Sequence, residues 1–220
     1  MTDLPAGPFG AILADPPWRF ETWSPNGRDR SADQHYLQTC KRWGAAEGAF
    51  ATIPLDALCS LPVADCAAPD CALFLWACCP MLPEALAVID AWGFTYKTVA
   101  FSWMKANMDG SPYMGLGYWT RANAELCLLA TRGTPKRINA DVPQAIYERR
   151  REHSRKPDCV HNRIERLVAG PYLELFGRQS RPGWVVWGNE ATKFDRSDEL
   201  PIDDAEHQLS LMGDHNAEPH

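Results

Sequence analysis

Short apolar runs, separated by polar turns and by segments with helical spacing, divide this chain into predicted elements. The apolar runs are of strand length, and they predict strands at residues 10–14, 71–76, 96–104, 125–131, 172–176 and 184–187. Apolar residues that recur every three or four positions predict helices at residues 53–58, at 82–92 and after 157. Strands that alternate with helices predict an α/β fold with a mostly parallel, doubly wound sheet.

Two polar stretches are predicted to be loops and a third to be a tail. Residues 19–36 form a long segment rich in Gly, Asn, Ser and Pro, and residues 107–117 form a shorter one. Long loops in compact domains tend to be functional or disordered. Residues 195–220 are polar and acidic, which predicts a flexible tail behind a single folded domain at residues 1–194.

The formal net charge of −6 hides an uneven distribution. Residues 195–220 hold eight acids and one base, so the rest of the chain has 20 acids and 21 bases. Within that part, residues 149–166 hold seven bases and three acids. Such a cluster is compatible with contacts to phosphates, and a solvated helix face explains the charge pattern equally well.

The sequence favours a cytoplasmic protein without a metal site. It has no apolar stretch long enough to span a bilayer, and residues 1–5 lack the basic and apolar regions of a signal peptide. Its eight cysteines are irregularly spaced, with no Cys-x-x-Cys pair. This pattern predicts reduced, mostly buried thiols and argues against zinc.

The strongest candidate for chemistry is Asp15-Pro16-Pro17-Trp18, which directly follows the first predicted strand. In open α/β sheets, ligands bind outside the carboxyl ends of the strands. Proline has a fixed φ and no backbone N–H, so the Asp15 carboxylate and the Pro16 carbonyl become two rigid acceptors beside an indole. This arrangement suits a planar group that carries an NH₂, such as adenine. The alternative is a surface turn or a polyproline segment that docks in a partner's groove.

Several blocks of the chain, in order, resemble those of the beta-class adenine-N6 methyltransferases that are marked by Asp-Pro-Pro-Trp. The bacterial and phage branch of this family is the closer match, and the resemblance runs from about residue 11 to 190. The catalytic block is followed by blocks at residues 73–76, 119–128, 153–157, 164–167, 174–178 and 188–190.

The resemblance implies a Rossmann-like fold that binds S-adenosylmethionine and methylates the N6 amine of adenine. It places the catalytic site at Asp15, Pro16, Pro17 and Trp18. Asp15 and the Pro16 carbonyl would accept the two N–H bonds of the amine, which exposes its lone pair, and Trp18 would stack on the base. The cofactor residues that the resemblance implies are Asp15, Lys156 for the cofactor carboxylate, Arg178, Asn189 and Glu190 for the ribose, and Glu174 in a supporting place.

The same resemblance makes residues 19–36 a gate over the substrate. The substrate-binding residues that it implies are Trp18, Arg28, His35, Tyr36 and Trp119. The implied partner is nucleic acid, DNA more than RNA, with no membrane, and both a homodimer and a heterodimer remain open.

Three alternatives compete with methylation of DNA. The same chemistry could act on adenosine in RNA, the chain could be a non-catalytic nucleic-acid-binding partner on the same fold, or the acceptor could be another amine. The intact Asp15 argues against the second, and an N4-cytosine enzyme would more often carry Ser at that position. Only fourteen residues precede Asp15, whereas larger relatives have an upstream strand whose backbone helps to hold the cofactor adenine. We expect that contact to be missing or to be supplied elsewhere, and we expect loops in place of a separate target-recognition domain.

Overall fold

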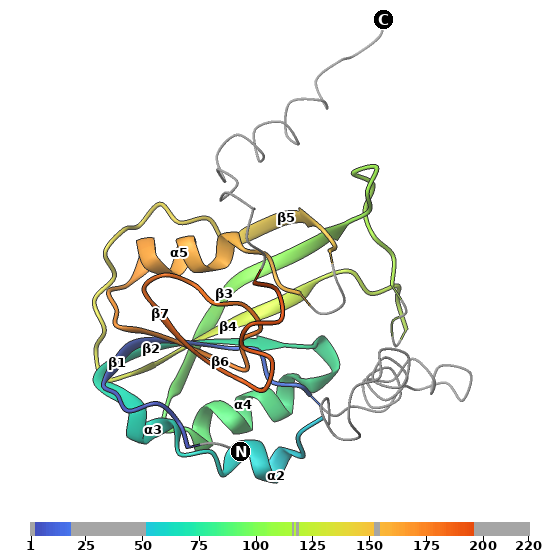
Figure 1. Cartoon of the computed structure of the whole chain (residues 1–220). Coiled ribbons are helices and arrows are strands. Elements are labelled where there is room, and N and C mark those ends of the chain that lie inside the picture. The colour runs from blue at the N-terminus through green and yellow to red at the C-terminus, as the bar shows by residue number, and fades with distance from the viewer. Residues whose placement is uncertain (1–2, 19–51, 116, 118, 152–154, 196–220) are drawn as a thin grey trace, which may run out of the picture.

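The computed structural model describes residues 3–18, 52–115, 117, 119–151 and 155–195 of the chain. These residues form a seven-stranded sheet with helices on both faces (Figure 1). The strands are β1 (Phe9–Ala14), β2 (Ala67–Ala77), β3 (Thr95–Ala106), β4 (Glu125–Arg132), β5 (Ala145–Arg149), β6 (Tyr172–Leu175) and β7 (Trp184–Trp187). The helices are α2 (Leu55–Cys59), α3 (Val63–Cys66), α4 (Leu82–Ala91) and α5 (Cys159–Leu167), with a 3₁₀ turn at Cys79–Met81.

The sheet is mixed: the prediction of a mostly parallel sheet holds for four of its six strand pairings, but it missed the reversal of β4. Its strand order is β5-β3-β4-β2-β1-β6-β7, and β4 is antiparallel to both of its neighbours, whereas the other four pairings are parallel. The reason lies in the connection between β3 and β4, whose described residues form no helix. Antiparallel strands can be joined by a loop, whereas parallel neighbours need a crossover. Six strands therefore share one direction, and β4 alone runs against them.

The six predicted strands and the three predicted helices all form, with bounds that differ by a few residues. The edge strand β5 was not predicted. Only Ile146 of its five residues is buried, and the strand ends in Glu148 and Arg149, so its sequence lacks the apolar run of a central strand.

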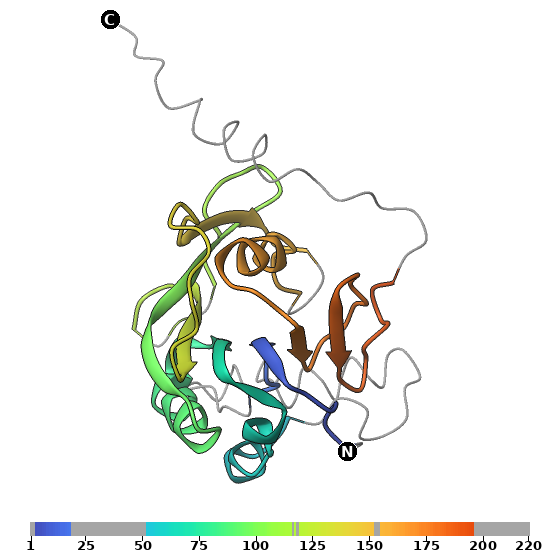
Figure 2. The same cartoon turned by 90° about the vertical axis from the view of Figure 1, so that its left-hand side faces the viewer.

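Two hydrophobic cores lie on opposite faces of the sheet. Successive side chains of a strand point to opposite faces, so Ile12 and Ala14 of β1 enter one core, whereas Ala11 and Leu13 enter the other. The first core packs against α2 and α4, and the second packs against α5. Figure 1 shows α5 above the sheet and α2, α3 and α4 below it, and Figure 2 shows the same layers from the side.

The described chain continues to Asp195, the first residue of the predicted tail. Both oxygens of its carboxylate accept hydrogen bonds from Ser180, one from the backbone N–H and one from the hydroxyl, each at 2.7 Å. Asp195 is thus anchored to the domain, and residues 196–220 lie outside the described residues. Among the described residues, no helix is long and apolar enough to cross a membrane.

Candidate active site

One edge of the sheet gathers most of the predicted site residues. Six strands end at this edge and β4 begins there, because β4 runs in the opposite direction. Asp15 follows β1, Arg178 follows β6 and Asn189 follows β7, while Lys156 lies between β5 and α5. Residues that are far apart in the sequence thus meet at the edge where open α/β sheets bind their ligands.

The Asp15-Pro16-Pro17-Trp18 segment is held by backbone bonds on both sides. The N–H of Asp15 donates to the carbonyl of Leu175, and the carbonyl of Pro17 accepts from the N–H of Ile53 at 3.1 Å. The Pro16 carbonyl accepts from the N–H of Trp18 at 2.8 Å. A carbonyl oxygen has two lone pairs, so Pro16 keeps one for a ligand.

Trp18 lies in the core rather than in the pocket. Its side chain is 4% exposed, and its indole N–H donates to the Trp76 carbonyl at 2.9 Å. This position differs from the predicted stacking on a target base, because other residues of the protein enclose the ring. Trp18 instead fastens the end of the Asp15 segment to the neighbouring strand β2.

Four side chains of alternating charge form the centre of the site. The Nζ atom of Lys156 lies 2.8 and 2.7 Å from the two oxygens of Asp15 and 3.3 Å from Oε2 of Glu125. The other oxygen of Glu125 accepts a hydrogen bond from Lys105, at the end of β3. The three N–H bonds of Lys156 are therefore matched by carboxylates, and the order along the cluster is Asp15, Lys156, Glu125, Lys105.

The electrostatics of this cluster favour the charged forms of Glu125 and Lys156. Burial would raise the pKa of Glu125, but Lys156 and Lys105 outweigh it and hold that pKa at about 2. Burial would lower the pKa of Lys156, and the two carboxylates raise it instead. For Asp15, burial outweighs the opposing effect of Lys156 and leaves the pKa above its usual value. Asp15 therefore depends on Lys156 more than on any other residue for its negative charge.

A pocket opens beside this cluster, between the ends of β1 and β6 and the start of α5. Its lining includes four of the predicted cofactor residues, namely Asp15, Lys156, Glu174 and Arg178. Glu174 is held from behind by His161 of α5, whose Nε2 lies 2.9 Å from Oε2 of the carboxylate. The ring of His161 meets Trp184 edge to face at 4.9 Å, and its Nδ1 is buried with no partner among the described residues. Because a carboxylate accepts, the ring proton belongs on Nε2.

The backbone next to the pocket adopts, at Phe176, a conformation that residues other than glycine rarely adopt. Phe176, which lines the pocket, has a φ of 63°, in the left-handed region. Such strain concentrates at functional sites. Gly177 and Gly188 lie back to back here: a Cβ on Gly188 would meet the Gly177 carbonyl at 2.7 Å, and a Cβ on Gly177 would meet Val186 at 2.4 Å. Only glycines allow the ends of β6 and β7 to approach this closely.

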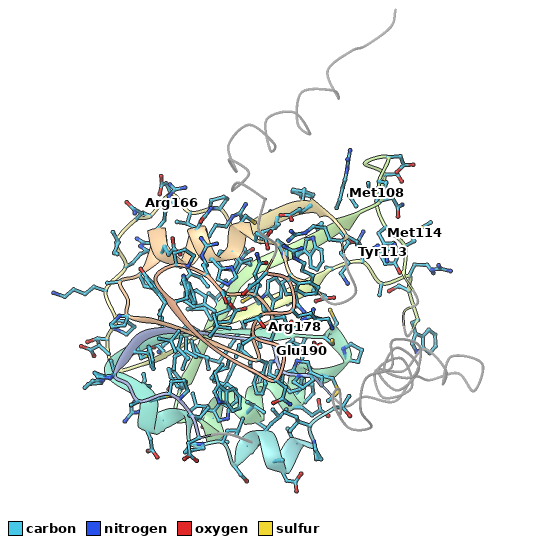
Figure 3. The ribbon with its side chains drawn as sticks, viewed as in Figure 1. Met108, Tyr113, Met114, Arg166, Arg178 and Glu190 are labelled. Atoms are coloured by element: carbon cyan, nitrogen blue, oxygen red, sulfur yellow. The ribbon has the colours of Figure 1, made fainter. Side chains whose placement is uncertain are left out.

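The remaining predicted cofactor residues lie beyond β7. Neither Asn189 nor Glu190 lines the pocket, and Glu190 forms an ion pair with Lys193 at 2.7 Å. Arg178 and Glu190 are labelled in Figure 3 near the ends of β6 and β7. Phe194, which does line the pocket, lies under the guanidinium groups of Arg155 and Arg178, each 5.0 Å from its ring centre.

Of the predicted substrate residues, Trp18 and Trp119 lie among the described residues. Arg28, His35 and Tyr36 lie outside the described residues. Trp119 lies on the loop between β3 and β4, is 93% exposed and does not line the pocket. The prediction of substrate contacts from these four residues thus remains a prediction.

Several side chains of the site were not predicted from the sequence, among them Lys105, Glu125, His161 and Phe194. Glu125 is the first residue of β4, and it lies at this edge because β4 runs antiparallel to its neighbours. The lack of a predicted helix between the strands at residues 96–104 and 125–131 could have indicated this direction. His161 and Phe194 carry no motif of their own, and their roles become visible only through their contacts with Glu174 and Arg178. Among the described residues, no group of three or more His, Cys, Asp or Glu side chains could hold a metal ion.

Comparisons with known proteins agree with this geometry. The MT-A70 family profile matches residues 9–190. The type II methyltransferase M.MunI of a Mycoplasma species is 33% identical over 197 residues, which is 85% of this chain and 79% of that protein. The human N(6)-adenosine-methyltransferase catalytic subunit METTL3 is 27% identical over 190 residues, 84% of this chain but 28% of METTL3. An MT-A70-like N(6)-adenosine-methyltransferase of Arabidopsis thaliana is 29% identical over 193 residues, 84% of this chain and 24% of its own length. The chain therefore belongs to the MT-A70 family of adenine methyltransferases.

Proposed function

We propose that this enzyme uses S-adenosylmethionine to methylate the N6 amine of adenine in DNA. The observation that carries the proposal is the Asp15 carboxylate, fixed at the carboxyl edge of the sheet by two bonds from Lys156 and open to the pocket. The strand order and the helices on both faces support a Rossmann-like arrangement for such an enzyme.

The chemistry of the pocket fits the cofactor. When bound, S-adenosylmethionine supplies a methyl group on a sulfonium centre that leaves as a neutral thioether. The pocket offers cations for a carboxylate in Lys156 and Arg178, a carboxylate for ribose hydroxyls in Glu174, and aromatic rings in Phe176 and Phe194. The close approach of Gly177 and Gly188 leaves backbone, rather than side chains, facing that end of the pocket. Asn189 and Glu190 complete the proposed set on the neighbouring loop.

Lys156 has two tasks in this proposal. Its three N–H bonds are directed at Asp15 and Glu125, so a cofactor carboxylate would have to replace or share one of them. Glu125 is the partner that Lys156 gives up most easily, because its 3.3 Å contact is the longest of the three. Lys156 can thus bind the cofactor and still hold Asp15 in place.

Asp15 and Pro16 prepare the acceptor amine. Each carboxylate oxygen keeps a lone pair beside its bond from Lys156, and the Pro16 carbonyl keeps one beside its bond from Trp18. Acceptance of both amine N–H bonds would pull the nitrogen out of conjugation with the ring. The Asp15 carboxylate would stabilise the positive charge that develops on the nitrogen and accept the proton that it loses.

We favour DNA over RNA as the substrate because the relatives align with this chain over different shares of their own length. The type II methyltransferase, of a class that modifies DNA, aligns along 79% of its length, whereas METTL3 aligns along 28%. RNA is the second candidate, since the described site aligns with an adenosine methyltransferase as well.

The test is transfer of labelled methyl from S-adenosylmethionine to duplex DNA, single-stranded DNA and RNA of matched sequence, with nucleoside mass spectrometry. N6-methyladenine in DNA, absent with Asp15→Ala, is the expected result. Methylation of RNA alone would replace DNA with the second candidate. Full activity of Asp15→Ala would contradict the assignment of Asp15.

A further inference from the structure

The basic side chains of residues 149–166 that the structure describes fall into two groups: those that are buried or paired with a carboxylate, and those that are exposed without such an ion pair. Arg151 and Arg155 pair with Asp158, Arg166 pairs with Asp141, and Lys156 belongs to the site. Arg163 is 2% exposed and donates to the carbonyls of Pro143 and Ala145.

Two exposed arginines of this segment remain, Arg149 and Arg150, at the end of β5. Within the described part of the chain, neither forms an ion pair with a carboxylate.

Arg150 is fixed against the loop that joins β3 to β4. We call residues 107–124 the arm. The guanidinium of Arg150 lies 3.7 Å from the ring centre of Tyr113 on the arm, and the backbone N–H of Arg150 donates to the Ala106 carbonyl at 3.1 Å. A guanidinium that stacks through its face keeps its N–H donors at the rim, where they can bind a phosphate.

The described part of the arm is itself held in place. Tyr113 donates its N–H to the Lys105 carbonyl at 2.9 Å, and its own carbonyl accepts from the side chain of Asn123 at 2.7 Å. Arg121 donates to the carbonyls of Met114 and Gly115. These bonds present Met108 and Met114 to solvent, 74% and 66% exposed, and Figure 3 shows both side chains beside Tyr113, beyond the end of β3.

The arm is continuous with the active site through one residue. The backbone N–H of Lys105 donates to Asn123, its carbonyl accepts from Tyr113, and its side chain pairs with Glu125. Arg149 and Arg150 end β5 at the edge where Asp15 ends β1. Three strands lie between β5 and β1 along this edge, so a long polyanion with one base in the site can extend along the edge to Arg149 and Arg150.

The charges of the surface favour that ligand over a protein. Among the described residues, its acids are Asp109, which the N–H and the hydroxyl of Ser111 engage and which Arg149 also attracts, and Glu148, which faces Arg151 at 3.8 Å. Exposed apolar side chains beside a pair of arginines suit a backbone of alternating phosphates and sugars.

We infer that Arg149, Arg150, Tyr113, Met108 and Met114, the arm patch, bind the sugar–phosphate backbone of the substrate DNA on the β5 side of the target adenine. This inference rests on the proposed function, because it assigns a surface to the DNA of that reaction. The arginines contact phosphates, Tyr113 orients Arg150, and the two methionines lie against the sugars.

The test compares Arg149→Gln/Arg150→Gln with Arg166→Gln, an exposed arginine at the end of α5 that is paired with Asp141 (Figure 3). Fluorescence anisotropy with a labelled 20-base-pair duplex gives the affinity at several salt concentrations, and calorimetry with S-adenosylhomocysteine checks the site. Loss of two phosphate contacts should weaken DNA binding about tenfold or more and reduce the log–log salt slope by roughly 1.8. Arg166→Gln should change neither, and all variants should bind S-adenosylhomocysteine like the wild type.

Tyr113→Phe and Tyr113→Leu separate orientation from charge. The phenyl ring retains the stack and should bind DNA like the wild type, whereas leucine should weaken binding with a smaller change in salt slope than the double arginine variant.

Three results would overturn the inference: an unchanged salt slope in the double variant, an equal loss in Arg166→Gln, or a change of oligomeric state by light scattering, which would make the patch an interface between copies. If the wild type binds duplex with a patch-dependent slope yet methylates RNA alone, the proposed function fails instead.

Discussion

Lys156 bonds both carboxylate oxygens of Asp15, at 2.8 and 2.7 Å, across 141 positions of the sequence. The two residues come from opposite ends of the domain, one after β1 and one before α5. The proposed acceptor of the amine protons is therefore oriented and charged by the residue that also faces the proposed cofactor. Binding of the cofactor and activation of the acceptor share one side chain.

Replacement of Lys156 should change the pH dependence of the reaction as well as its rate. Lys156 lowers the pKa of Asp15 against the effect of burial, so Lys156→Gln should raise that pKa. Activity that needs ionised Asp15 should then begin at higher pH, with kcat/KM reduced at least a hundredfold at neutral pH. The pH profile of kcat/KM measures both effects. A lower rate with an unchanged acidic limb would mean that Lys156 acts on the cofactor alone.

Glu125 should stabilise the fold in a pH-dependent way. Its pKa of about 2 lies below the ordinary value of 4.5, so its contribution is complete above about pH 4.5 and disappears as the pH falls towards 2. Glu125→Gln should cost at most about 3 kcal/mol at pH 7, since solvent reaches part of the side chain. Urea unfolding between pH 7 and pH 3 follows the difference from wild type. Asp141→Asn, in an exposed ion pair, is the control, and a difference that does not shrink with falling pH would contradict the charge of Glu125.

The sequence predicts the elements of the sheet better than their directions. Apolar runs identify the central strands, because burial on both faces leaves a continuous signal in β1 and β2. The direction of β4 depends on the connection before it, and the edge strand β5 has little burial to leave a pattern.

The same distinction applies to the site. Asp15 and Lys156 belong to motifs and lie in the pocket, whereas the contact between them is a product of the fold. Trp18 shows the reverse case: its place in a motif suggested a pocket residue, and its indole N–H is bonded to Trp76 in the core. Motifs indicate which residues matter, and packing decides what each of them touches.

Trp18→Phe should therefore reduce stability more than it affects the substrate. The substitution removes the hydrogen bond to the Trp76 carbonyl and some packing, which should cost about 1–2 kcal/mol of unfolding free energy. The KM for an adenine-containing oligonucleotide should stay within about twofold of wild type, because the ring is buried. Urea unfolding and steady-state kinetics on the same preparations separate the effects. A tenfold rise in KM with normal stability would restore base stacking by Trp18.

His161 should act on the cofactor through Glu174. In His161→Leu the Glu174 carboxylate loses the donor at 2.9 Å and can turn away from the pocket, so the affinity for S-adenosylhomocysteine should fall about tenfold, or about 1.4 kcal/mol. His161→Gln places an N–H near the position of Nε2 and should restore most of that affinity. A cofactor analogue without ribose hydroxyls supplies the decisive control, because it cannot use Glu174 and should bind wild type and His161→Leu equally. If the leucine variant loses affinity for both compounds, His161 serves the packing against Trp184 rather than the orientation of Glu174.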